Sequence, residues 1–401
     1  MAPVVPGTGA TAGTGKAFLA GLRREVRFLR SSFWDLALVS WIPLALLAVM
    51  AIQLSSGVMR DLPIAVVDED GGAIARELTR RLDAAPGLRV AARPAEMRDA
   101  ERLVRSQAVY AIVLIPRETE RAVLHGSTAS IPVFYNASFS TASGAALREV
   151  GNVTQGYAAR LAVEQTAAVA GPDKVRPPPV AAQTTILFNP QGSYELQLVA
   201  LIHPALLHLV FMVAVVSALG RELRDGTIGA WLGGAPRLSA AAAVAGKISV
   251  YFVFFMGWGV LATGYLAGLR GWPVLGSPLM LFAGYVAMYL AYAGVALLVT
   301  GITLSMGRAL SVAGLYAGAS FAFAGAIFPV ESASGFAQFW SAILPYTAFA
   351  KLLAEQWMMG SPAAVSFPQV LIMLVFLAVG AAIGLPRYIH AAATPAAWGR
   401  R

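Results

Sequence analysis

Long apolar segments alternate with polar stretches along this chain, and their lengths predict membrane spans. A helix needs about 20 apolar residues to cross the hydrocarbon core of a bilayer. The first such segment covers residues 33–54. Five more lie within 196–386, at about 196–219, 248–268, 279–301, 309–328 and 368–386. The pattern therefore predicts six transmembrane helices.

Residues 55–195 separate the first predicted span from the second, and their pattern is typical of a water-soluble unit. Apolar runs such as IAVVDED at 64–70 and AVYAIVLIP at 108–116 alternate with charged helical stretches. A longer helical pattern starts at Ser138 and precedes a proline-rich joint at 172–180. Alternating strands and helices indicate a compact α/β unit. The predicted fold is an α-helical integral membrane protein with an inserted extracytoplasmic α/β domain.

The distribution of basic residues predicts the orientation of the spans. Arginine and lysine are frequent in the N-terminal tail at 1–32, in the segment 220–247 and in the C-terminal tail at 387–401. Cytoplasmic segments of membrane proteins carry an excess of these residues. An even number of spans then places both termini in the cytoplasm. Because the composition, rich in Ala, Gly and Arg, is consistent with a bacterial source, we expect a multi-pass protein of the bacterial inner membrane.

Composition supports a membrane protein and excludes several kinds of site. Of the residues, 57% are hydrophobic and only 13% are charged, whereas a soluble domain carries roughly 25% charge. The net charge of +9 is concentrated around the spans, which favours contact with anionic membrane lipid over nucleic acid. The chain has no cysteine, so disulfides and thiolate metal sites are excluded.

The sequence offers no energy source of its own. The run GTGATAGTGKA at 7–17 resembles a phosphate-binding loop, but Ala17 stands where such a loop needs Ser or Thr, and no strand precedes it. Predicted spans two to six contain no Asp or Glu, which disfavours a proton relay. His203 and His208 are five residues apart and do not share a helix face, so they predict no metal pair and fit helix packing or the headgroup level. We therefore expect a chain that is not an enzyme, binds no cofactor and receives its work from another protein.

The segment at 216–252 joins the second predicted span to the third and carries an ordered series of short motifs. They are Arg221-Glu222, Asp225, Gly226-Thr227, Trp231-Leu232, Pro236 and Gly246-Lys247. This order resembles the cytoplasmic coupling region of type-2 ABC exporter permeases, in which an Arg-Glu pair at the end of span two is followed by an acidic residue, Gly-Thr, a hydrophobic helix and a proline, and Gly-Lys opens span three. One departure is Gly229, where the family often has Glu. Further similarities cover most of the chain, at IAVVDED (64–70), at FNP (188–190), and at Phe328-Pro329 with Pro345-Tyr346-Thr347.

The resemblance implies a permease subunit that exports cargo with ATP hydrolysed on a separate ABC ATPase. It also implies a second permease copy, identical or different, and handover to a periplasmic adaptor protein. A short charged helix after span two would carry the push, with Glu222, Arg224, Asp225 and Thr227 bearing the ATPase contact. The full set of expected ATPase-coupling residues is Arg221, Glu222, Arg224, Asp225, Gly226, Thr227 and Ile228.

The cargo is predicted only by class. Hydroxyl and aromatic residues in the spans suit hydrophobic or amphipathic cargo, and the candidates for lining a path are Tyr285, Tyr289, Tyr292, Thr303 and Tyr316. The first three tyrosines share one helix face, for which ordinary helix–helix packing is the more common explanation. A different interpretation of the chain is a membrane-anchored sensor or assembly factor with a ligand-binding outer domain.

Overall fold

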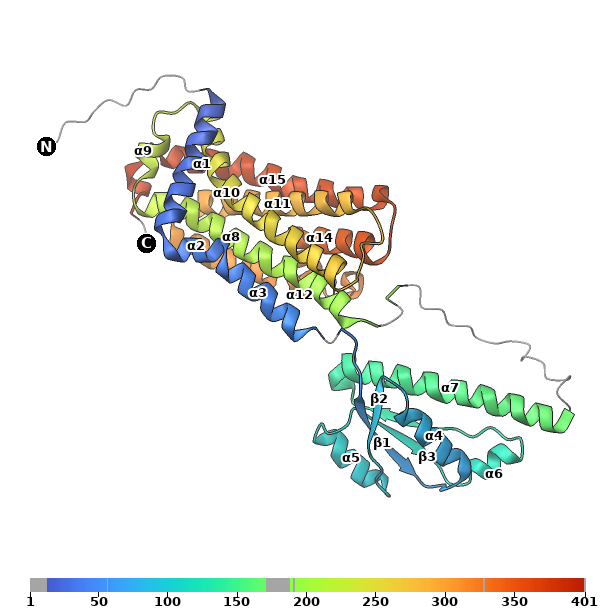
Figure 1. Ribbon diagram of the computed structural model, residues 1–401. Helices are drawn as coiled ribbons and strands as arrows, with labels where there is room; N and C mark the ends of the chain where they lie inside the picture. Colours follow the sequence, from blue (N-terminus) through green and yellow to red (C-terminus); the bar gives the residue numbers. More distant parts are fainter. Residues whose placement is uncertain (1–12, 56, 171–187, 190–191, 327–328, 400–401) are drawn as a thin grey trace. The chain divides into compact units, whose positions relative to one another are not determined.

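The structure is a computed structural model that describes residues 13–55, 57–170, 188–189, 192–326 and 329–399 (Figure 1). The chain forms two compact units. The membrane unit comprises Met1–Ser55 and Glu195–Arg401, and the inserted unit comprises Ser56–Tyr194. The predicted proline-rich joint at 172–180, residue 190 of the FNP motif and Phe328 lie outside the described residues.

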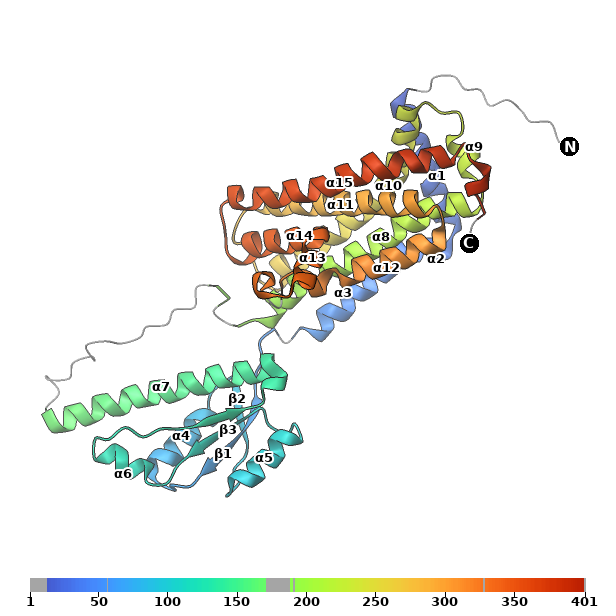
Figure 2. The same ribbon diagram turned by 180° about the vertical axis from the view of Figure 1, so that it is seen from behind.

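The membrane unit is a bundle of long helices (Figures 1 and 2). The first strongly apolar segment is split into α2 and α3, and later helices are lengthened by π-helical turns, η3 before α8, η4 after α10 and η6 after α14. The elements are α1 (Thr14–Ser31), α2 (Phe33–Val39), α3 (Trp41–Gln53), η3 (Glu195–Val199), α8 (Ala200–Arg224), α9 (Ile228–Leu232), α10 (Arg237–Gly264), η4 (Tyr265–Leu269), α11 (Pro278–Thr303), α12 (Met306–Phe323), α13 (Gly335–Ile343), α14 (Pro345–Leu353), η6 (Ala354–Met358) and α15 (Ala363–Ala391).

Within the described residues, five helical segments are long and apolar enough to cross a membrane. They are Phe33–Gln53, Glu195–Arg224, Arg237–Leu269, Pro278–Thr303 and Ala363–Ala391. The predicted fold class, a helical membrane protein with an inserted α/β unit, is confirmed. The sequence predicted six spans, and the remaining one, at 309–328, corresponds to α12, an 18-residue helix outside these five. Its crossing of the membrane stays a prediction.

The first span breaks at Ser40, between α2 and α3. Pro43 lacks an amide N–H, and its ring crowds the carbonyl of Val39 four residues earlier. That carbonyl accepts a hydrogen bond from another helix instead, since the Trp258 indole of α10 donates to Val39 O at 2.8 Å. The break therefore attaches the first span to α10.

Helices α11 and α15 approach each other closely through glycines. A Cβ on Gly380 would lie 2.0 Å from the carbonyl oxygen of Gly294, and one on Gly301 would lie 2.3 Å from the carbonyl oxygen of Gly384. Small residues at such positions let transmembrane backbones meet and gain dispersion contacts, since lipid gives them no hydrophobic driving force.

The inserted unit is a four-stranded sheet covered on both faces. The strand order is β2-β1-β3-β4, with β1 parallel to β2 and β3, and β4 antiparallel to β3. Ile64 and Val66 of β1 belong to the core shared with α4 and α7, whereas Ala65 and Val67 belong to the core shared with α5. Two covered faces explain the nearly continuous apolar run of β1. The elements are β1 (Leu62–Asp68), α4 (Ala73–Asp83), β2 (Leu88–Ala92), α5 (Met97–Arg105), β3 (Ala111–Ile115), α6 (Thr119–Leu124), β4 (Val133–Tyr135) and α7 (Ser140–Ala170).

Candidate functional site

A buried ion network joins α1, α8 and α10 at the end of the membrane unit that holds α9. Glu25 of α1 is completely buried. Its carboxylate accepts from Arg221 of α8 at 2.8 Å and lies 2.5 Å from the Lys247 ammonium of α10. The Tyr251 hydroxyl, one turn after Lys247, donates to the same carboxylate. Three donors from two helices thus surround one buried acid.

A second carboxylate of the network is Glu222, which is 3% exposed. The Arg24 guanidinium binds it in bidentate fashion, at 2.9 and 2.8 Å, and Lys247 donates to it at 2.7 Å. The Thr227 hydroxyl donates to it as well. The hydrogen bond from Arg24 to Glu222 raises the pKa of that guanidinium, so Arg24 is charged at every physiological pH.

Charges in the network are balanced. Arg221 also lies 3.3 Å from Asp35 of α2, so the cations Arg24, Arg221 and Lys247 face the acids Glu25, Asp35 and Glu222. Buried charges are tolerated when they are paired and hydrogen-bonded, whereas removing one partner leaves an uncompensated charge at high cost. The arrangement therefore holds four helices in one fixed geometry.

Helix α9 is attached to this network through an aromatic ring. The Trp231 ring lies under two network cations, with Arg24 Cζ at 5.7 Å and Lys247 Nζ at 5.1 Å from its centroid. Both distances are within the range of cation–π attraction. Because Thr227 immediately precedes α9 and binds Glu222, the short helix is held at both ends by the same group of charges.

Glycines bring α1 onto the start of α10. A Cβ on Gly246 would lie 2.0 Å from the carbonyl oxygen of Phe18, and a Cβ on Gly21 would lie 2.0 Å from that of Ala243. Only glycine allows this approach. The Gly246-Lys247 pair therefore has two structural roles, since the glycine lets α1 pack closely against α10 and the lysine binds Glu25 of α1.

The C-terminal segment covers the turn between α8 and α9. Gly226 in that turn has φ +68°, which glycine adopts without strain. The Trp398 ring occupies the space beside Gly229, where an added Cβ would lie 2.3 Å from the ring. The Gly399 amide donates to Leu223 O at 3.0 Å, and the Trp398 indole donates to Ala391 O at 2.8 Å. A glutamate at 229 would collide with this ring, which gives a physical reason for glycine there.

The structure locates the expected coupling residues, and their contact with an ATPase stays a prediction. Helix α8 continues without a break to Arg224, so no separate charged helix follows the span, and the short helix is α9. Glu222, expected to bear an ATPase contact, is buried in the ion network, as is Arg221. Their side chains are engaged within the chain and do not reach its surface.

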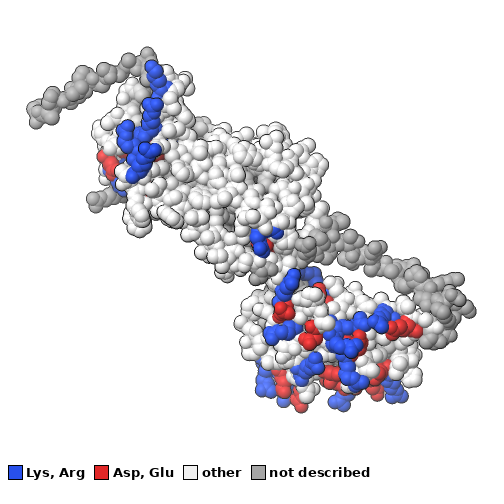
Figure 3. Space-filling model, in the orientation of Figure 1, with Lys and Arg blue, Asp and Glu red and all other residues white. Residues whose placement is uncertain are grey.

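The remaining coupling candidates divide between surface and interior. Arg224 and Asp225 pair with each other at 2.8 Å and are 45% and 43% exposed. Ile228 is buried, and Gly226 and Thr227 are half-buried. Figure 3 shows basic side chains gathered over α1 at this end, while the body of the membrane unit on the same face is almost free of charge.

The tyrosine face of α11 packs between helices. Tyr285, Tyr289 and Tyr292 are all buried. The Tyr285 hydroxyl and His203 Nε2 are 2.7 Å apart, and the Tyr292 hydroxyl and Ser320 Oγ are 2.8 Å apart.

His208 completes the same core. Its ring stacks on Tyr292 and on Tyr346, at centroid distances of 4.2 and 4.8 Å. Thr303 donates to Val299 O within its own helix, and Tyr316 donates to Ile343 O. Helix packing, the second interpretation of this pattern, is what the contacts support for the tyrosines and both histidines.

A cavity of about 610 Å³ lies within the membrane unit. Residues from the first span, the start of α8 and the end of α10 form its wall. The lining is Leu44, Leu47, Ala48, Met50, Ala51, Val199, His203, Val260, Leu261, Ala262, Gly264, Tyr265 and Leu269. Nearly all of these side chains are apolar, so the cavity suits hydrophobic molecules.

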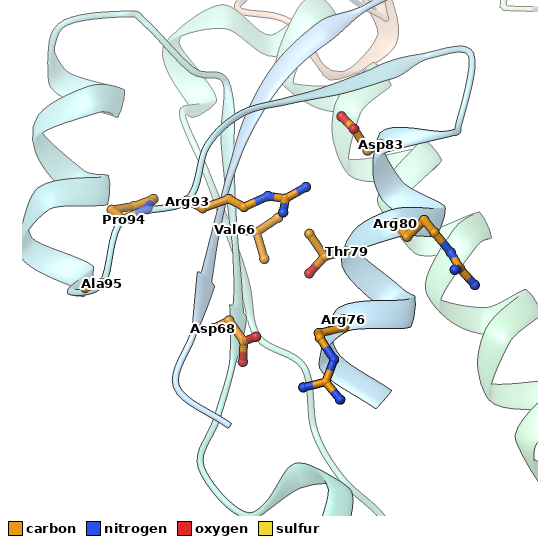
Figure 4. A pocket seen from close by; sticks show the side chains of 9 residues that line it. All are labelled: Val66, Asp68, Arg76, Thr79, Arg80, Asp83, Arg93, Pro94 and Ala95. Carbon is orange, nitrogen blue, oxygen red and sulfur yellow. The ribbon is translucent and has the colours of Figure 1, made fainter. Parts of the chain in front are cut away.

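A second cavity, of about 430 Å³, lies in the inserted unit between α4, β1 and the loop after β2. Figure 4 shows Arg93 reaching from that loop toward α4, and Arg76 of α4 on the same side as Asp68. Asp68 accepts backbone amides of Asp70 and Gly71, and Asp83 accepts that of Val90. The two carboxylates thus stabilise turns. Arg76 also donates to Gly71 O, and Arg80 pairs with Glu77. The remaining guanidinium N–H groups of the lining are the donors that an anion would use.

Most of the chain is similar to a known protein family. A family model described as "ABC-2 family transporter protein" matches residues 33–385. Neither a curated protein nor a solved structure matches the chain. The matched range includes the whole inserted unit and most of the membrane unit, and leaves out α1 and the C-terminal segment that carries Trp398.

Proposed function

The chain belongs to the ABC-2 family of transporter membrane proteins, and from this premise we propose that it exports hydrophobic or amphipathic cargo from the cytoplasmic side of a bacterial inner membrane. As a member of that family it is a multi-pass, permease-type subunit that lacks an ATPase site, and such permeases pair with an ABC ATPase. The proposal adds the direction of transport, the class of cargo and the route by which ATP-driven force enters.

The ion network is the observation that carries the proposal. It joins α9 and the end of α8 to α1, α2 and α10 through charges that are balanced and buried. A rigid connection of this kind transmits displacement, because side chains in a packed, hydrogen-bonded cluster cannot move separately at low cost. A push on α9 would therefore reach the first three spans together.

The surface that receives the push consists of residues left outside the network. Arg224 and Asp225 form an exposed charged pair, and Leu238 at the start of α10 is 71% exposed. The Trp398 ring lies beside Gly226 and Gly229. Gly226, Thr227 and Ile228 then act as the connection between this surface and the network. ATP binds and is hydrolysed on the partner, which closes and displaces the surface.

The expected assembly is two permease chains with two ATPase subunits, and both termini lie in the cytoplasm. This orientation places the coupling surface and the basic face of α1 on the ATPase side, where anionic lipid favours the positive charge. The inserted unit then faces the periplasm and hands cargo to an adaptor protein. The apolar cavity between the first three spans supports hydrophobic or amphipathic cargo, because it offers such molecules a lining without charged groups.

Charge reversal at the exposed pair tests the coupling. The double substitution Arg224→Glu with Asp225→Lys keeps the intramolecular pair but reverses the surface it presents, so we expect the permease to fold and the stimulated ATP turnover of the co-purified complex to fall roughly tenfold. The matched control is Arg308→Glu, a charge reversal at another exposed position, at the start of α12, which should leave turnover unchanged.

Two outcomes would contradict the proposal. Unchanged stimulation in the double variant would remove the pair from the coupling surface. Transport of an amphiphile into or out of vesicles by the purified chain alone, without any nucleotide-hydrolysing subunit, would overturn the premise that force comes from a partner.

A sensor with a ligand-binding outer domain is the second candidate, and the charged cavity of the inserted unit is the observation that favours it. Arg76 and Arg93 would hold an anionic ligand there. If this is the main function, Arg93→Ala should abolish binding of an anion to the full chain, while the ATPase subunit should have no effect on any measured activity.

A further inference from the structure

We propose that the cavity between α3, α8 and α10 binds one acyl chain of a membrane phospholipid, with the phosphate at Arg270. The role of this site in export rests on the proposed function, whereas the binding itself does not. Its lining comes from one half of each of the three helices, the end of the first span, the beginning of α8 and the end of α10. By the predicted topology this is the outer half of the membrane.

Water is a poor occupant of this cavity. Buried waters need two to four polar partners, and His203 is the residue with ring nitrogens in the lining. Its Nδ1 already lies 2.6 Å from Val199 O, and its Nε2 lies 2.7 Å from the Tyr285 hydroxyl. With both nitrogens engaged, the hydroxyl of Tyr265 is the other side-chain polar group of the lining. One hydroxyl offers water too few partners, while an apolar chain recovers the dispersion contacts that an empty space would lack.

The hydrocarbon of the bilayer can reach the cavity. The first span forms one wall of the cavity, yet only 22% of its apolar 18-residue stretch is buried. On the opposite wall, Leu261 and Leu269 are 54% and 81% exposed. Side chains that line the cavity are therefore also part of the lipid-facing surface, and acyl chains are the molecules that surround them.

The α8 and α10 walls of the cavity each contain a π-helical turn in place of regular α-helix. The turn η3 leads into α8 and contributes Val199, and η4 ends α10 and contributes Tyr265 and Leu269. Single π-helical turns are rare in proteins and occur frequently at functional sites, because they widen a helix and redirect its side chains. Two of them border the same cavity, one on each side.

A cation lies next to this lining, at the ends of the same two helices. Arg270 follows Leu269 directly and binds Glu195 of η3 at 2.5 Å, and the Trp272 indole donates to Glu195 at 2.9 Å. The Glu195 side chain is 2% exposed, whereas that of Arg270 is 31% exposed. The guanidinium therefore keeps surface for a phosphate oxygen, and the indole is at the interface level that Trp prefers. An apolar cavity with one accessible cation beside it matches a phospholipid.

Two glycines of α10 provide a matched test. Gly264 lines the cavity and Gly257 does not, and in both cases an added Cβ meets nothing within 4 Å. Gly264→Phe should therefore fill the cavity without a backbone collision, and Gly257→Phe makes the same chemical change elsewhere on the same helix. Ala48→Phe fills the cavity from the first span and guards against an effect peculiar to one helix.

The experiment is photolabelling of the full chain in nanodiscs that contain phosphatidylglycerol with a diazirine in its acyl chain, followed by mapping of the labelled peptides. No ATPase or nucleotide is present, so failure here and failure of the proposed function remain distinguishable. We expect label at 44–51 and 260–269 in the unmodified chain and in Gly257→Phe. Labelling should fall roughly tenfold, about 1.4 kcal/mol of binding free energy, in Gly264→Phe and Ala48→Phe.

Other results would overturn the proposal. Equal labelling in Gly264→Phe and Gly257→Phe would mean that lipid only touches the outer surface. Absence of label together with a cross-link between two copies at these helices would mean that a second permease covers the cavity. Undiminished labelling when a diazirine diacylglycerol, which has no phosphate and no charge, replaces the phospholipid would remove Arg270 from the site.

Discussion

The two ends of α8 are held in place in different ways. At the end near α9, Arg221 and Glu222 belong to a network that also contains Glu25, Asp35 and Lys247. At the other end, Glu195 pairs with Arg270 beside an apolar cavity. One end is thus fixed by several mutually dependent buried contacts. The other is fixed by a partly exposed ion pair together with hydrogen bonds from Trp272 to Glu195 and from Arg270 to Ser55 O.

This difference suggests how α8 could transmit a displacement at one end and change the shape of a binding cavity at the other. A fully satisfied buried network loses much when any member is displaced, so it moves as a unit. A cavity with a partly exposed ion pair can open and close with smaller changes in contact energy. We therefore expect displacement to enter at the α9 end and to change the shape of the Glu195 end.

The largest expected effect is loss of the central acid of the network. Glu25→Gln keeps the size of the side chain but leaves Arg221 and Lys247 without one of their two carboxylates, so we expect about 3–5 kcal/mol of destabilisation. Thermal unfolding of the detergent-solubilised chain measures it. The control is Glu331→Gln at an exposed position of the loop before α13, which should stay within about 0.5 kcal/mol. Equal stability of the two variants would contradict the network's importance.

An intermediate effect is expected where α1 meets α10. A Cβ at Gly246 would lie 2.0 Å from the Phe18 carbonyl, so Gly246→Ala must displace α1 and should cost about 1–3 kcal/mol. Gly257→Ala adds the same methyl group to the same helix in open space and should be neutral or stabilise by up to about 1 kcal/mol, since alanine favours helix. The difference between the two unfolding midpoints is the measurement, and a difference near zero would mean that α1 is not held against α10.

Local patterns in the sequence predicted much of the fold, because a span or a buried strand is encoded by neighbouring residues. The apolar runs located the long helices, and IAVVDED located β1 with its acidic end. The break at Pro43 was not predicted, since its compensation by Trp258 comes from a helix more than 200 residues away. The tyrosine spacing was compatible with both packing and a path, because periodicity marks a helix face without naming its neighbour.

The candidate site was predicted only in part for the same reason. The segment 220–247 was identified by its motif, but nothing in that motif pointed to Glu25 or Asp35, which lie far away in the sequence. Their partner Arg221 lies 196 and 186 residues away along the chain. A lone acid in a strongly basic helix was the available signal. Trp398 gave no signal, because the space it fills exists only when Gly229 has been placed.

The smallest expected effect lies at the Glu195 end of α8. Glu195→Gln keeps a hydrogen-bonding group beside Arg270 and Trp272 and removes the charge of a partly exposed pair, so we expect a loss of only about 1 kcal/mol, well below that for Glu25→Gln. Arg270 then keeps its charge without a neutralising partner. Phospholipid photolabelling of the cavity should therefore increase while the unfolding midpoint falls slightly, whereas Glu25→Gln should lower the midpoint without increasing the label. If Glu195→Gln instead destabilised the chain as strongly as Glu25→Gln, both ends of α8 would be equally rigid. The cavity would then not change shape more easily than the ion network.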